Sequence, residues 1–184
     1  MGNTIDVRGF GKLSKAPDAS APLLVVFGGI PVHGIQSGVY MWKYMNTIKD
    51  RFHIFVAHSH AVNGPDSYRA LLKTLKAQGL TPPKQILYLF SGGYRPGKGL
   101  LTDVGPARFS SILLVDIWMG DSSVSDFYKA LVDANVAKTT YVYTTFGAAN
   151  EGARDYIAKS LGPQRAIPHM PDHMGTNTVA VGTL

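Results

Sequence analysis

The residues best suited to chemistry stand at the end of an apolar run near the middle of the chain. The run Ile86–Phe90 shows no alternation of polar and apolar side chains, which is typical of a central parallel strand buried on both faces. Ser91 follows at once, and Gly92 and Gly93 follow Ser91. A sharp turn of this kind exposes a serine Oγ at the edge of a sheet, and small residues leave room for a substrate. We therefore interpret Ser91 as a candidate nucleophile.

Two other interpretations of the same turn remain open. It can be a plain connection from strand to helix in which the serine has no chemical role. Gly92, Gly97 and Lys98 also have most of the spacing of a phosphate-binding loop, but that motif needs Ser or Thr after the lysine to hold magnesium, and Gly99 stands there. The sequence therefore favours a nucleophile over a phosphate loop.

The turn, a Gly28-Gly29 loop after an earlier apolar run, and an aspartate and a histidine later in the chain resemble the α/β-hydrolase superfamily of serine esterases, lipases and amidases. The superfamily's turn has the pattern Gly-x-Ser-x-Gly, which Gly93 matches and Leu89 does not. The resemblance covers most of the chain in element order. It implies a serine hydrolase that cleaves an ester or amide, with a small-molecule or polymeric acyl substrate and no cofactor.

In this fold the nucleophile is followed along the chain by an acid and then by a histidine. Asp116 ends the next apolar run, where an ionised side chain is costly unless it has a partner, so we expect it to orient the histidine. Asp121 and Glu151 are the alternatives for the acid. The base is expected after the last strand, where His169 and His173 both lie. We favour His173, because the superfamily's histidine tends to begin a short segment of small residues.

Backbone N–H groups would hold the charge that develops on the attacked carbonyl oxygen. The resemblance assigns this role to Gly92 and to either Gly29 or Ile30, since Pro31 has no N–H. A single helix is expected to join the strand of Asp116 to the next strand, which leaves little room for a helical lid. The predicted site is therefore open. The side chains expected to contact the substrate are Tyr94, Trp118 and His33.

A metal-dependent hydrolase is an alternative from another class. His58 and His60, two residues apart on an extended segment, would point the same way, and zinc takes three such ligands and a water. His33, Asp66 and the tail histidines can complete the set, although no His-Glu-x-x-His or comparable spacing occurs. A domain of the same fold that binds a ligand without catalysis is the third interpretation.

Composition sets wider limits. The 184 residues suit a single domain spanning residues 1–184, and 45% hydrophobic content supports a sizeable core. The net charge of +6 is spread thinly and does not argue for a specific nucleic-acid partner. The absence of cysteine excludes disulfides, thiolate metal sites and a cysteine nucleophile. With no signal peptide and no run of about 20 apolar residues, we expect a cytoplasmic protein without a membrane span.

The remaining pattern places these residues on an alternating fold. Residues 97–108, behind Ser91, are poor in helix formers, so the helix there is expected to be short or displaced. Strands are predicted at 4–10, 23–27, 53–57, 86–90, 111–117, 140–145 and 165–167, and helices at 37–49, 65–78, 122–135 and 150–161. This order predicts an α/β fold with a mostly parallel sheet of about five to seven strands and helices on both faces. Ligands of such sheets bind at the carboxyl ends of the strands.

Overall fold

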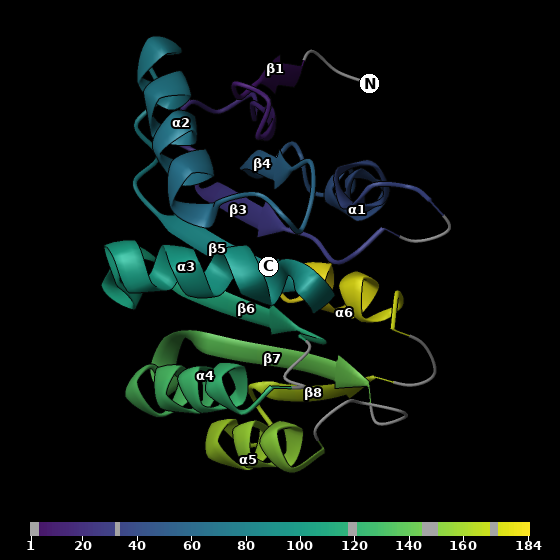
Figure 1. Cartoon of the computed structure of the whole chain (residues 1–184). Helices are drawn as coiled ribbons and strands as arrows, with labels where there is room; N and C mark the ends of the chain where they lie inside the picture. Colours follow the sequence, from purple (N-terminus) through teal and green to yellow (C-terminus); the bar gives the residue numbers. More distant parts are fainter. Residues whose placement is uncertain (1–3, 32–33, 118–120, 145–150, 170–172) are drawn as a thin grey trace.

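The computed structural model of the chain describes residues 4–31, 34–117, 121–144, 151–169 and 173–184. The strands are β1 (Thr4–Asp6), β2 (Gly11–Ser14), β3 (Leu23–Phe27), β4 (His53–Ala57), β5 (Gln85–Phe90), β6 (Ser111–Val115), β7 (Thr139–Thr144) and β8 (Ala166–His169). The helices are α1 (Ser37–Met45), α2 (Gly64–Ala77), α3 (Tyr94–Val104), α4 (Ser122–Ala134), α5 (Glu151–Leu161) and α6 (Thr176–Gly182). Together they form a single α/β domain (Figure 1).

The strands form one sheet in the order β1-β2-β4-β3-β5-β6-β7-β8. The strands from β4 to β8 all run parallel, whereas β2 is antiparallel to β4 and β1 is antiparallel to β2. The predicted mostly parallel sheet is confirmed, with eight strands among the described residues. Because β3 and β5 are neighbours, the loop after Phe27 and the turn at Ser91 meet at the same edge.

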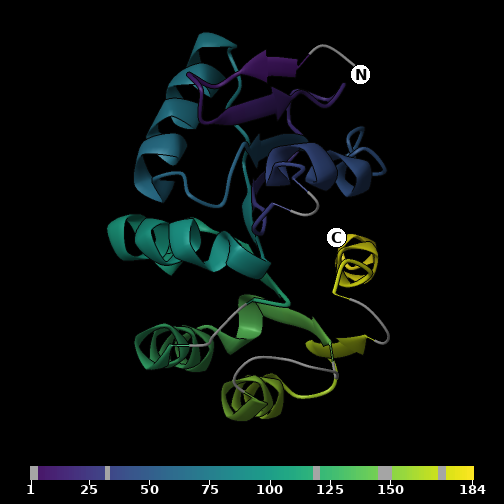
Figure 2. The same ribbon diagram turned by 45° about the vertical axis from the view of Figure 1, so that its right-hand side comes forward.

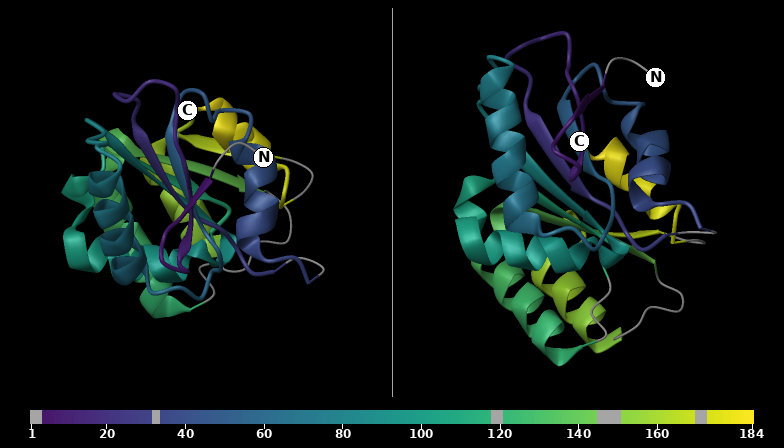
Figure 3. Two further views of the ribbon diagram at one scale, coloured as in Figure 1. Left: turned by 90° about the horizontal axis from the view of Figure 1, so that it is seen from above. Right: turned by 45° about the horizontal axis from the view of Figure 1, so that its top comes forward.

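The helices cover both faces of the sheet unequally. Helices α2, α3, α4 and α5 lie on one face, and α1 and α6 lie on the other (Figures 2 and 3). Strand side chains alternate between the two layers: Leu87 and Leu89 pack in the larger core, and Tyr88 and Phe90 pack in the smaller one. Burial at every position of β3 and β4 explains their unbroken apolar sequences. No helix in the described part of the chain is long and apolar enough to cross a membrane.

The amino-terminal prediction is wrong in one respect. A single strand was expected over residues 4–10, but residues 4–14 form a hairpin of two strands, β1 and β2, at the edge of the sheet. The chain turns at Arg8 and Gly9, which both have positive φ, and the Val7 N–H donates to the Gly11 carbonyl. The alternating rather than continuous apolar pattern of this edge gives a weaker strand signal than the buried runs.

Two helices also depart from the prediction. The helix expected to be short or displaced behind Ser91 is α3, which spans 11 residues and follows the turn directly. The tail forms α6, which the sequence did not predict because Thr, Asn, Val and Gly favour helices weakly. Burial of Ala180 and Val181 against the smaller core stabilises this helix despite the weak helix propensity of its residues.

The position of α3 explains the departure at Leu89. Leu89 is fully buried, and a Cβ added to Gly97 of α3 would lie 2.5 Å from both of its terminal methyl carbons. The superfamily pattern places glycine on the strand, whereas this chain has leucine on the strand and glycine on the helix that packs on it. The helix can therefore approach the sheet closely despite the bulk of Leu89.

We expect Gly97→Ala to lower the free energy of unfolding by about 1–3 kcal/mol, because its methyl would overlap Leu89 in a filled core. Gly99→Ala is the matched control on the same helix, since its methyl would meet Pro65 Cδ at 3.5 Å, an ordinary contact. Alanine there should stabilise the helix by up to about 1 kcal/mol. Urea unfolding followed by circular dichroism measures both variants. Equal stability of the two would contradict the proposed fit of Leu89 to Gly97.

Candidate active site

Ser91 begins a tight 3₁₀ turn, Ser91–Gly93, directly after β5. Its φ is +49°, a left-handed backbone conformation that a residue with a side chain rarely adopts without compensation from its surroundings. Compensation comes from close backbone packing: a Cβ on Gly93 would lie 2.2 Å from the Phe27 carbonyl oxygen. The side chain of Ser91 is then held at the carboxyl edge of the sheet beside Gly29, whose Cβ position lies 3.0 Å from Ser91 Oγ.

Asp116 and His173, which are 57 residues apart in sequence, are brought together at the same edge. Asp116 follows β6, also has a positive φ of +43°, and donates its N–H to the Val142 carbonyl at 2.7 Å. Its carboxylate oxygen Oδ2 accepts a hydrogen bond from Nδ1 of His173. The side chain of Asp116 is 10% exposed and that of His173 is 46% exposed, so a shielded carboxylate holds an accessible imidazole.

The alternative acids are used elsewhere or lie at a helix end. Asp121 is the N-cap of α4, where its Oδ1 accepts from the N–H groups of Ser123 and Val124 at 2.8 and 3.3 Å. Hydrogen bonds from the Ser123 side chain and from these backbone groups lower the pKa of Asp121. Glu151 lies in the first turn of α5. Of the three candidate acids, Asp116 accepts a hydrogen bond from the tail histidine His173.

The imidazole of His173 lies against the residue that precedes Ser91. Its ring stacks on Phe90 with centroids 4.6 Å apart and an interplanar angle of 28°. In the described residues no hydrogen bond joins Ser91 Oγ to His173, and such contacts are often long in unliganded enzymes and tighten with substrate. His169, the other candidate base, ends β8 in register with Thr144.

Buried polar contacts fix the segment that carries His173. The Thr176 hydroxyl donates to the His173 carbonyl at 2.6 Å, and the Asn177 amide donates to the Met174 carbonyl at 3.2 Å. Asn177 Oδ1 in turn accepts from the Tyr88 hydroxyl at 2.7 Å, with both residues buried. Burial raises the pKa of Tyr88, so Tyr88 remains a neutral donor. The central strand β5 thus leads into the turn of Ser91 and also anchors α6.

The loop after β3 approaches the turn of Ser91 from the other side. The Ile30 N atom lies 3.2 Å from the position that a Gly92 Cβ would occupy. The Tyr40 hydroxyl of α1 donates to the Ile30 carbonyl at 3.1 Å, and the Tyr40 ring meets Phe90 edge-on at 6.3 Å. Burial raises the pKa of Tyr40 to about 12, and a backbone hydrogen bond from Gly29 offsets part of that rise. Tyr40 therefore holds the Gly29-Ile30 backbone as a neutral hydroxyl.

Of the three side chains predicted to contact the substrate, Trp118 and His33 lie outside the described residues. Tyr94 is half buried against the larger core; its hydroxyl accepts from Arg95 Nε at 3.0 Å and its carbonyl accepts from Tyr128. A role of Tyr94 in substrate binding stays a prediction.

The metal alternative gains no support from the described side chains. No group of three or more His, Asp or Glu side chains there could hold a metal ion. His58 pairs with Asp6 at 3.7 Å, and Nδ1 of His60 is buried without a hydrogen-bond partner. The tail histidine His173 is engaged by Asp116.

Sequence reasoning missed the residues that position the site. Tyr88, Phe90 and Asn177 were not assigned roles, and Tyr40 was considered only as an aromatic residue near the mouth of the site. A polar hydroxyl inside an otherwise apolar central strand, as at Tyr88, is the one local signal, because a buried hydroxyl needs a partner. That partner, Asn177, is 89 residues away and cannot be identified without the fold.

Comparison with known proteins agrees with this architecture. The strand order, the antiparallel β2, and the turn after β5 define an α/β-hydrolase fold, and the chain has that fold. No protein-family model matches the sequence, and no curated protein matches it by sequence. The likeness therefore rests on solved structures.

Three solved structures illustrate this likeness in fold. Poly(aspartic acid) hydrolase-1 from a Sphingomonas species has a TM-score of 0.61 at 15% identity, covering 98% of this chain and 97% of its own. An esterase domain of a Rhodothermus marinus protein has a TM-score of 0.58 at 9% identity, covering 94% and 87%. N-formylmaleamic acid deformylase from Pseudomonas putida has a TM-score of 0.57 at 14% identity, covering 99% and 100%.

We expect Tyr88→Phe to lower the free energy of unfolding by about 1–3 kcal/mol, because it leaves the buried Asn177 oxygen without its donor. Amide hydrogen exchange in α6 should accelerate in the same variant. Tyr156→Phe is the control: it also removes a tyrosine hydroxyl, but from an exposed contact with Asp133, and should change stability by less than about 0.5 kcal/mol. Unchanged exchange in α6 would contradict the anchoring role.

Proposed function

We propose that this protein is a serine hydrolase that cleaves an ester or amide bond through an acyl-enzyme on Ser91. The observation that carries the proposal is the hydrogen bond from His173 to Asp116, made while the imidazole stacks on Phe90, the neighbour of Ser91. The proposed nucleophile, base and orienting carboxylate follow one another in the chain order that this fold uses, which supports the proposal. The positive φ of Ser91 is a second support, because it is typical of a nucleophile raised on a sharp turn.

The proposed reaction assigns each group one task. Ser91 Oγ attacks the acyl carbon and its proton passes to Nε2 of His173, while Asp116 stabilises the imidazolium through Nδ1–H. The tetrahedral intermediate collapses, and the leaving group takes the proton from His173. Water then attacks the acyl-enzyme and gives a proton to His173, which returns it to Ser91 as the acid product leaves.

The oxyanion would be held by the backbone N–H groups of Gly92 and Ile30. Gly92 follows the nucleophile, and the Ile30 N atom is adjacent to it. Between the two donors considered for the second position, Ile30 is favoured because its N atom lies 3.2 Å from the position of a Gly92 Cβ. Tyr40 is thus a positioning residue, since it binds the carbonyl of Ile30 on the same loop.

The surroundings suit an accessible acyl substrate. Among the described residues a single α-helix, α4, lies between β6 and β7, the region where this superfamily inserts lids. Ile30 is 51% exposed and Ile35 is 49% exposed, so an apolar rim flanks the proposed oxyanion loop. The solved structures named above include hydrolases of poly(aspartic acid) and of N-formylmaleamic acid, which supports hydrolysis of acyl bonds in general. Trp118, His33 and Tyr94 remain the proposed substrate contacts.

The first test is covalent labelling with a fluorophosphonate probe. We expect wild-type protein to be labelled stoichiometrically at Ser91, and Ser91→Ala to lose labelling and ester hydrolysis while unfolding normally. Ser110→Ala is the control, because Ser110 is exposed at the opposite edge of the sheet and should keep both.

The outcomes of this test separate the three classes of function. Labelling at another serine would overturn the assignment of Ser91. Hydrolysis that persists in Ser91→Ala and is blocked by a chelator would favour the metal-dependent alternative. A folded protein that neither reacts with the probe nor hydrolyses esters would favour a binding domain.

The second test compares the two tail histidines. His173→Ala should lower kcat for an activated ester by about 10³-fold or more, because the serine loses its base. His169→Ala should retain activity within a few-fold, because His169 ends β8 in register with Thr144, whereas His173 is the histidine that bonds to Asp116. The reverse result, with His169 essential and His173 dispensable, would show that the base is misassigned.

A further inference from the structure

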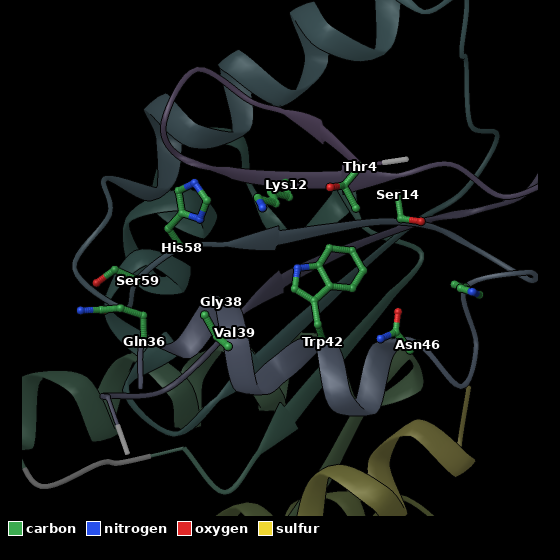
Figure 4. A pocket seen from close by; sticks show the side chains of 11 residues that line it. Thr4, Lys12, Ser14, Gln36, Gly38, Val39, Trp42, Asn46, His58 and Ser59 are labelled. Carbon is green, nitrogen blue, oxygen red and sulfur yellow. The ribbon is translucent and has the colours of Figure 1, made fainter. Parts of the chain in front are cut away.

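A cavity lies on the side of α1 away from Ser91. It has a volume of about 510 Å³ and is bounded by the β1–β2 hairpin and by α1 (Figure 4). In β2, Gly11 and Leu13 are buried toward the larger core, so Lys12 and Ser14 face the opposite layer. Helix α1 covers β3 and β4 on that layer and leaves the hairpin uncovered. We refer to this cavity as the hairpin groove.

Helix α1 separates the hairpin groove from the proposed active site. Val39, Trp42 and Asn46 follow one another at helical spacing and line the groove. Tyr40 projects from the same helix to Phe90 and to the Ile30 carbonyl, on the active-site side. The groove therefore has its own lining, and a ligand bound there would not contact Ser91.

The helix wall of the groove is rigidly placed. The amino end of α1 is tied to the end of β4 by two hydrogen bonds to the His58 carbonyl, from the Gly38 N–H at 3.1 Å and from the Ser37 hydroxyl at 3.4 Å. A Cβ on Gly38 would lie 2.9 Å from the Ala57 carbonyl oxygen, so the helix and the strand end are in direct contact. A preformed wall lowers the entropy cost of binding a small ligand.

The chemistry of the lining is aromatic and basic. The indole of Trp42 stands between the helix and the hairpin in the middle of the groove (Figure 4). The charged or titratable side chains that line it, among the described residues, are Lys12, Lys49 and His58, and none is acidic. Asp6 lies outside the lining, where it pairs with His58 at 3.7 Å and stands opposite Lys12 in the hairpin register.

We propose that the hairpin groove binds a small organic anion with a flat apolar body, such as an aromatic carboxylate. The ring would stack on Trp42, and the carboxylate would pair with Lys12 or Lys49. The volume lies within the range of about 300–1,000 Å³ that small-molecule sites usually have. Hydroxyl and amide groups at Ser14 and Asn46 provide further donors. This site is independent of the proposed hydrolysis at Ser91.

The probe pair is 2-naphthoate and its neutral analogue 2-naphthylmethanol, titrated by calorimetry at low ionic strength. We expect 2-naphthoate to bind at least about threefold more tightly than the alcohol, and its advantage to shrink in high salt. Trp42→Ala should weaken 2-naphthoate binding more than about tenfold, because the aromatic platform is lost. Protein labelled covalently at Ser91 should bind as well as unlabelled protein.

Lysine variants test the charge without disturbing the core. Lys12→Met and Lys49→Met each keep the apolar stem and remove one charge, and at least one of them should abolish the preference for 2-naphthoate. Lys43→Met is the matched control, because Lys43 is an exposed lysine of α1 that faces a different hollow beside Tyr44 and Met174. The proposal is overturned if both naphthalenes bind equally, if Trp42→Ala binds normally, or if Lys43→Met has the same effect as the groove variants.

Discussion

The arrangement depends on direct contact between the backbone after β3 and the backbone of the turn after β5. Gly93 lies so close to the Phe27 carbonyl that no side chain fits between them, and a Cβ on Gly29 would lie 2.7 Å from the Cβ of Ser91. Because β3 and β5 are paired strands, this contact is made where both strands end. The strained conformation of Ser91 and the approach of the Ile30 N–H to Gly92 both follow from it.

The smaller core connects this contact to the rest of the proposed site. Phe90 contacts Tyr40 of α1 edge-on and stacks on His173 of the tail, so one ring lies between the helix that holds the proposed oxyanion loop and the proposed base. One position earlier, Tyr88 binds Asn177 and fixes the helix that follows His173. Strand β5 therefore organises three segments that are distant in sequence, through side chains on the face covered by α1 and α6.

The sequence predicted those parts of the structure that depend on burial and on local chemistry. Strands β3 and β4 were predicted with their observed bounds, because every position is buried and the apolar run is unbroken. The contact between Asp116 and a tail histidine was also expected, from the cost of an unpartnered charge in a buried strand. What the sequence missed depends on contacts across the fold: α3 has glycine at position 97 because it packs on Leu89, and α6 is helical because the smaller core buries it. The hairpin was missed because its turn at Arg8 and Gly9 interrupts a weak edge-strand pattern.

The fit between Leu89 and Gly97 has a consequence for how this chain can evolve. Leu89 and Gly97 can each change only if the other compensates, because the strand has the large member of the pair and the helix has the small one. A single substitution at either position leaves an overfilled or an underfilled pair, so we expect the two positions to change together. A sequence search that requires glycine two positions before the serine would overlook this chain. Diversification of substrate range is left to positions outside this packed pair, such as the exposed Ile30 and Ile35.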